Sequence, residues 1–92
     1  MNHNTIKSLQ KEHGFDGLQE LINNGHAWNL EGSVGRSAMG ALESGACMLP
    51  KERRMDAYCN IVPSRDELKA GTKGTYKNSV RFWTEAEEEG YF

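Results

Sequence analysis

The chain has 92 residues, of which 37% are hydrophobic and 26% charged, and its net charge is −2 at pH 7. This length and composition predict a single small globular domain spanning residues 1–92 and exclude a second hydrophobic core. No run approaches the roughly 18 apolar residues of a membrane span, and the first residues lack the basic and apolar regions of a secretory signal, so we expect a cytoplasmic protein.

The first quarter of the sequence predicts two short helices. Thr5 is a plausible cap for a helix that Gly14 ends, because glycine readily adopts the left-handed conformation found after helices. Asp16 has the spacing of a capping box, and the apolar residues after it recur at helical intervals up to Gly25. The two segments form either a helical hairpin or one helix kinked at residues 14–15.

Residues 26–30 are either a short strand or an extended connector. Ser33 then predicts the start of a third helix, which Gly45 ends. Gly35 and Gly40 inside that helix each cost about 1 kcal/mol relative to alanine. Close packing of the helix against the sheet is the favoured explanation for them, and a binding partner lying on a bare helix face is the alternative.

The second half favours strands. Residues 46–49 predict a buried strand that Pro50 ends, and residues 55–62 alternate with the two-residue period of a half-buried strand. Ser64 begins a second capping-box pattern, which predicts a single helical turn. Residues 75–83 are predicted to form strand-like stretches in a hairpin. Residues 84–87 are predicted to start a last frayed helical turn. We therefore expect an α+β fold, with N-terminal short helices packed on a small antiparallel sheet of about three or four strands.

Charge is distributed unevenly along the chain. Residues 1–50 carry three bases and five acids, residues 51–83 carry eight bases and four acids, and residues 84–92 carry four acids and no base. The acidic segment 84–92 is expected to be a solubilising tail, with contact to the basic segment or to a basic partner as alternatives.

Basic side chains interleaved with aromatic ones can hold phosphates and stack on bases, although a solvated polar face has the same composition. The predicted contact surface comprises Arg36, Lys51, Arg53, Arg54, Arg65, Lys69, Lys73, Lys77 and Arg81.

The sequence offers no set of residues for catalysis or for metal binding. His13 and His26 fall at predicted helix ends, and no metal-ligand spacing connects them to a cysteine. Cys47 and Cys59 lie in apolar, strand-like runs and are expected to be reduced and buried. Residues 32–37 are similar to a small phosphate-binding loop but lack its Gly-Lys-Ser/Thr ending. We expect no enzyme activity, no cofactor, no metal and no small-molecule substrate.

Residues 24–36 read Asn-Gly-His-Ala-Trp-Asn-Leu-Glu-Gly-Ser-Val-Gly-Arg and precede the basic second half. In length and general character the whole chain is similar to the phage-encoded anti-CRISPR proteins that inhibit type I-F surveillance complexes. The resemblance implies a non-enzymatic inhibitor that binds a multi-subunit RNA-guided complex in the host bacterial cell, contacts its guide RNA and blocks pairing with target DNA. It carries no motif that assigns roles to individual residues. The alternative is a small nucleic-acid-binding regulator from a phage or mobile element.

Overall fold

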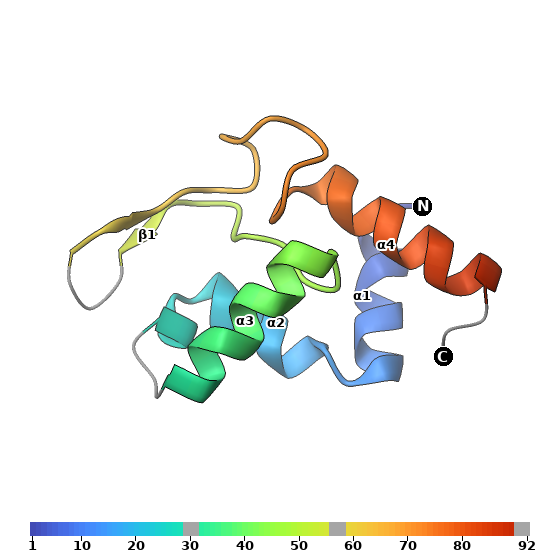
Figure 1. Cartoon of the computed structure of the whole chain (residues 1–92), viewed down its shortest axis with the longest axis horizontal. Helices are drawn as coiled ribbons and strands as arrows, with labels where there is room; N and C mark the ends of the chain where they lie inside the picture. The colour runs from blue at the N-terminus through green and yellow to red at the C-terminus, as the bar shows by residue number, and fades with distance from the viewer. Residues whose placement is uncertain (29–31, 56–58, 90–92) are drawn as a thin grey trace.

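The computed structural model describes residues 1–28, 32–55 and 59–89 (Figure 1). The molecule measures 40 × 26 × 19 Å along its principal axes. Its elements in chain order are α1 (His3–His13), α2 (Asp16–Asn23), the 3₁₀ turn η1 (His26–Trp28), α3 (Gly32–Ser44), β1 (Arg54–Met55), β2 (Ile61–Val62) and α4 (Tyr76–Glu89). In Figure 1, α4 and α1 lie at one end of the molecule, and the β1–β2 hairpin projects from the other.

The N-terminal region forms two separate helices, as one of the two sequence alternatives predicted. The N-cap of α1 is Asn2 rather than Thr5: its Oδ1 accepts the Thr5 N–H at 2.9 Å. Gly14 ends α1 with a φ of 82°, as expected, and α2 begins two residues later at Asp16. The single kinked helix is therefore the wrong alternative.

The predicted third helix is confirmed as α3, and Gly45 follows its last residue with a φ of 105°. A Cβ at Gly45 would lie 2.6 Å from the carbonyl oxygen of Asn78, so the absence of a side chain lets α4 approach this turn. Residues 26–28 form η1 rather than a strand, and the rest of that predicted segment lies outside the described residues.

The predicted strand at residues 46–49 is wrong, although the segment is buried. Its polar backbone groups bond to side chains and to a loop instead of to a neighbouring strand. Gln19 accepts the Met48 N–H at 2.8 Å and donates to the Met48 carbonyl at 2.8 Å, while the Leu49 N–H donates to the carbonyl of Gly74. These hydrogen bonds give the buried backbone N–H and carbonyl groups of the segment their partners without a neighbouring strand.

The predicted strand at residues 55–62 is a hairpin rather than one continuous strand. β1 and β2 pair antiparallel, with Arg54 opposite Val62 and Met55 opposite Ile61. Cys59 has a φ of 63°, which an extended strand does not allow, and residues 56–58 of the predicted strand lie outside the described part. The sheet in the described ranges therefore has two strands instead of three or four.

The predicted strands at residues 75–83 are also wrong, because this segment belongs to α4. Thr75 caps the helix by accepting the Asn78 N–H at 3.3 Å. Tyr76, Val80 and Trp83 recur at helical spacing, and Trp83 is completely buried. The β-branched and aromatic residues favoured a strand, but their spacing lets one helix face reach the core.

The predicted acidic tail at residues 84–92 is wrong, because its four acidic residues belong to α4, which continues to Glu89 and buries Ala86. Residues 90–92 lie outside the described part of the chain.

Trp83 joins α4 to the N-terminal helices. Its ring lies 5.7 Å from that of His13 and 6.0 Å from that of Phe15, while Phe82 meets it edge-on at 4.9 Å. Cys47 is buried in the same core, as expected, whereas Cys59 is exposed and contradicts the prediction. The fold is thus α+β, with helices packed mainly on one another and a small sheet at the edge. None of the helices described is long and apolar enough to cross a membrane.

Candidate anion-binding groove

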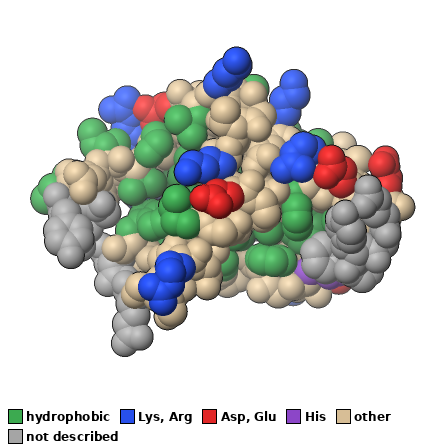
Figure 2. All heavy atoms as spheres, in the orientation of Figure 1, with side chains coloured by type: hydrophobic (Ala, Val, Ile, Leu, Met, Phe, Trp, Pro, Cys, Tyr) green, Lys and Arg blue, Asp and Glu red, His purple; other side chains and the backbone are tan. Residues whose placement is uncertain are grey.

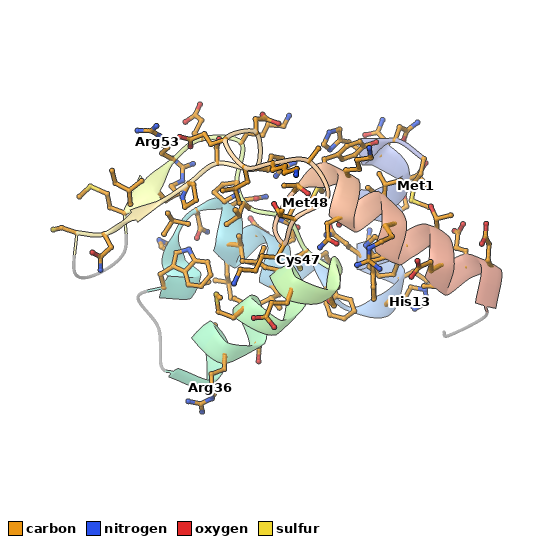
Figure 3. The ribbon with its side chains drawn as sticks, turned by 45° about the horizontal axis from the view of Figure 1, so that its top comes forward. Met1, His13, Arg36, Cys47, Met48 and Arg53 are labelled. Atoms are coloured by element: carbon orange, nitrogen blue, oxygen red, sulfur yellow. The ribbon has the colours of Figure 1, made fainter. Side chains whose placement is uncertain are left out.

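The nine basic residues predicted as a contact surface do not form one surface. Figure 3 shows two of them, Arg36 and Arg53, at opposite edges of the molecule. Four bases pair with carboxylates of the same chain: Arg53 with Glu67, Arg54 with Glu52, Lys73 with Glu43 and Arg81 with Glu85. Lys51, Lys69, Lys77 and Arg36 are exposed and form no ion pair with another described residue.

Arg81 and Arg53 have structural contacts that explain their positions. Arg81 donates to Asn78 Oδ1 and, at 3.0 Å, to the carbonyl of Ser44, so it holds α4 against the end of α3. Arg53 donates to Glu67, whose other carboxylate oxygen accepts the Ser64 N–H at 2.7 Å. This contact is the half of the predicted capping box in which Glu67 accepts the Ser64 N–H, but the predicted helical turn is wrong, because the segment forms turns and bends.

Three of the predicted bases, Lys51, Arg54 and Arg65, line one groove of about 490 Å³. Helix α1 forms another part of its wall and contributes His3 and Lys7. We call this hollow the cationic groove. Its lining carries four lysine or arginine side chains and one carboxylate, that of Glu52.

His3 and Lys7 of α1 were not among the predicted contact residues. His3 and Lys7 are four residues apart and so share one face of a helix, which is a signal present in the sequence. What the sequence does not reveal is that this face lies beside residues from the second half of the chain. The groove therefore exists only once the tertiary structure has formed.

Arg65 is the most unusual charge in the cationic groove. It is only 8% exposed, and its Nε donates to the carbonyl oxygen of Leu49 at 2.7 Å. No carboxylate of a described residue lies within ion-pair distance of it. Burial lowers the pKa of Arg65, and the negative charge of Asp66 opposes that change. Because arginine stays protonated in proteins, the groove holds a buried cation without a paired anion.

The positive charges of the cationic groove also affect the pKa of His3. Its pKa is lowered by burial and then by the positive charges of Arg65 and Lys51. The ring stacks on Tyr76 with centroids 4.2 Å apart, and the Tyr76 hydroxyl donates to the Met1 carbonyl at 2.7 Å. A bound anion at this wall would raise the pKa of His3 and favour its protonated form.

Arg54 is the groove cation with the clearest structural task. Its Nε donates to the carbonyl of Asn23 at 2.9 Å, which ties β1 to the end of α2. Its guanidinium also lies 3.7 Å from Glu52, so the single carboxylate of the groove is already paired. Lys7, Lys51 and Arg65 remain as the cations available to a ligand.

The phosphate loop considered at residues 32–37 is wrong, because these residues form the first turns of α3. Within the described ranges, no three histidine, cysteine or acidic residues are grouped as metal ligands. The chemistry that the cationic groove supports is the binding of an anion through charge and N–H donors. Compared with known proteins, the chain matches no family model, no curated protein and no solved structure.

Proposed function

We propose that this protein acts by binding rather than by catalysis, and that the cationic groove holds a backbone phosphate of RNA within an RNA–protein complex. The observation that carries the proposal is the buried Arg65 guanidinium, which lines the cationic groove and forms no ion pair with a carboxylate of a described residue. A guanidinium presents several N–H donors in a fixed plane. A phosphate matches it, because its oxygens can accept several of these hydrogen bonds at once.

Lys7 and Lys51 supply further positive charge at the same groove. Both are exposed, so they can reach a phosphate without disturbing the core. Their two elements are far apart in the sequence, and their charges add only in the folded protein. Binding should therefore depend on the folded state and weaken as salt concentration rises.

The resemblance to type I-F inhibitors indicates which complex to test first. In this proposal the protein occupies the exposed guide RNA of a type I-F surveillance complex in the bacterial cytoplasm and blocks pairing with target DNA. Inhibition follows from occupancy, because a bound protein and a target strand compete for the same RNA.

The test compares two double variants with the same change in charge. Lys7→Glu with Lys51→Glu reverses two charges in the cationic groove, while Lys69→Glu with Lys77→Glu reverses two exposed charges outside it. We expect the groove variant to bind the assembled complex about tenfold more weakly or worse, and the control to change by less than about threefold. Equal loss in both variants would contradict the groove, and no binding by the unmodified protein would contradict the type I-F target.

A second candidate function, a nucleic-acid-binding regulator, is favoured by the same cluster of cations. It requires binding to free oligonucleotides, whereas the inhibitor requires the assembled complex. With about three phosphate contacts, the logarithm of affinity for a single strand should fall with a slope of about −2 against the logarithm of salt concentration. Such a slope on free RNA, without binding to the complex, would select the regulator.

A further inference from the structure

One face of α3 carries charged, apolar and glycine residues and is not covered by the described part of the molecule. Gly32, Arg36, Met39 and Glu43 follow one another at intervals of four, three and four residues, so they share one stripe of the helix. With Gly40 they line a shallow hollow beside Trp28. We call these five residues the α3 seam. Figure 3 shows Arg36 pointing away from the body of the molecule.

An apolar groove adjoins the α3 seam: Met39 of the seam and the neighbouring Trp28 line both the groove and the shallow hollow. This groove has a volume of about 500 Å³, and Lys73 supplies the charge in its largely apolar lining. Met39 is 39% exposed and Ile61, on the hairpin, is 61% exposed. Figure 2 shows hydrophobic side chains gathered on the left of the face that carries α3. A surface of this kind is typical of a protein contact.

Gly40 has no packing reason within the described chain. A Cβ built on it meets nothing within 4 Å among the residues that the structure describes, and one on Gly35 meets only the Ala27 carbonyl, at 3.8 Å. The favoured sequence explanation, close packing against a sheet, is therefore wrong. A bare Gly40 leaves room for a side chain from outside, which was the alternative.

The charges on the α3 seam are self-complementary. Arg36 and Glu43 lie at equal distances along the helix from the midpoint between Met39 and Gly40. If two copies of α3 pack antiparallel about a twofold axis at that midpoint, each Arg36 lies opposite Glu43 of the other copy. Each Met39 then lies opposite Gly40 of the other copy, where the space for its side chain is open.

We propose that the α3 seam pairs with the α3 seam of a second copy of this chain to form a twofold-symmetric dimer. Arg36 is available for this contact, since it has no ion pair with another described residue. Glu43 has only a contact of 4.0 Å with Lys73, and both side chains are more than half exposed. The dimer covers Met39 and brings the two apolar grooves close to the interface.

The first test uses charge reversal and rescue, read by sedimentation equilibrium at protein concentrations up to about 1 mM. We expect the unmodified chain to dimerise, and Arg36→Glu or Glu43→Arg alone to weaken the dimer about tenfold or more, because like charges then face each other twice. The double variant Arg36→Glu with Glu43→Arg should recover most of the affinity. Lys77→Glu, on α4, serves as the control and should have little effect.

The second test addresses shape. Gly40→Leu fills the space that Met39 of the second copy would occupy, while the monomer has room for the added side chain. We expect loss of the dimer with an unchanged or raised melting temperature of the dilute monomer, because leucine favours a helix more than glycine does.

A monomeric wild-type chain at 1 mM, a Gly40→Leu dimer of unchanged affinity, or a double charge variant without rescue would each overturn the proposal. If the α3 seam binds a different protein instead of a second copy, the wild-type chain should stay monomeric at 1 mM.

Discussion

Gln10 donates a hydrogen bond from its Nε2 to Oε1 of Gln19 at 2.9 Å, and both side chains are buried. Each glutamine also bonds to the backbone of the central buried segment: Gln10 to the Ala46 carbonyl, and Gln19 to both polar groups of Met48. The pair thus performs for residues 46–48 what a neighbouring strand performs in a sheet. Figure 3 shows Cys47 and Met48 of this segment in the interior, among the helices.

Replacing Gln19 with methionine should destabilise the protein strongly. Gln19→Met keeps a side chain of similar size but leaves the Met48 N–H and carbonyl without their partners in the core. We expect a loss of about 2–4 kcal/mol in the free energy of unfolding, measured by chemical denaturation. Glu20→Met, at the exposed neighbouring position, should change it by less than about 0.5 kcal/mol. Equal effects would show that the hydrogen bonds contribute little.

Replacing glycine with alanine should destabilise the protein at Gly45 and Gly74 but stabilise it at Gly40. At Gly45 a Cβ would lie 2.6 Å from the Asn78 carbonyl oxygen, and at Gly74 it would lie 2.7 Å from the Leu49 side chain. Both glycines also have positive φ, so each substitution should cost about 2 kcal/mol or more. Gly40→Ala has open space and ordinary helical geometry, and should stabilise the dilute chain by about 1 kcal/mol. Thermal unfolding of the three variants distinguishes these effects.

The two thiols should differ in reactivity by a large factor. Burial raises the pKa of Cys47 to about 12, whereas Cys59 is exposed. Because the thiolate is the reactive species, one thiol per native chain should react rapidly with a disulfide reagent, and both should react after unfolding. Cys59→Ser should remove the rapid phase, and Cys47→Ala should retain it. A rapid phase from two thiols would contradict the burial of Cys47.

Glu67 should make stability depend on pH in the acidic range. The Ser64 N–H, and then Arg53, lower the pKa of this carboxyl in the folded protein. Its stabilisation is therefore fully present above the ordinary glutamate pKa of about 4.3 and is lost as pH falls through the lower folded value. The difference in unfolding free energy between the wild type and Glu67→Gln should be constant from about pH 7 to pH 5 and shrink below about pH 4.

A second variant separates the two causes of that pKa shift. Arg53→Gln removes the cation but leaves the Ser64 N–H, which has the larger effect. We expect Arg53→Gln to reduce the acid dependence without abolishing it. Complete loss in this variant would assign the shift to the ion pair alone.

The helices at the N-terminal end could be predicted from local patterns. The glycine at position 14 and the period of apolar residues in α3 both act within a few residues, and the structure retains both. The helix at residues 76–89 was missed because its β-favouring residues outweighed a helical spacing that was also present.

The cationic groove was predicted only in part. Lys51, Arg54 and Arg65 were among the expected contact residues, but their convergence with α1 was not visible in the sequence. Arg53, Lys73 and Arg81 were expected on the same surface and instead pair with carboxylates of their own chain. Pairing of this kind depends on which residues fold beside one another, not on their density along the chain.

The sequence by itself determined helical structure on both sides of Gly14 and in α3, and an excess of bases in residues 51–83, because helix formation and charge are local properties. Only the tertiary structure decided that residues 46–48 bond to glutamine side chains, and that, among the described residues, Arg65 is buried without an ion pair and Gly40 faces open space. Each of these depends on groups more than a few residues apart, whose contact is set by how the helices pack around the core.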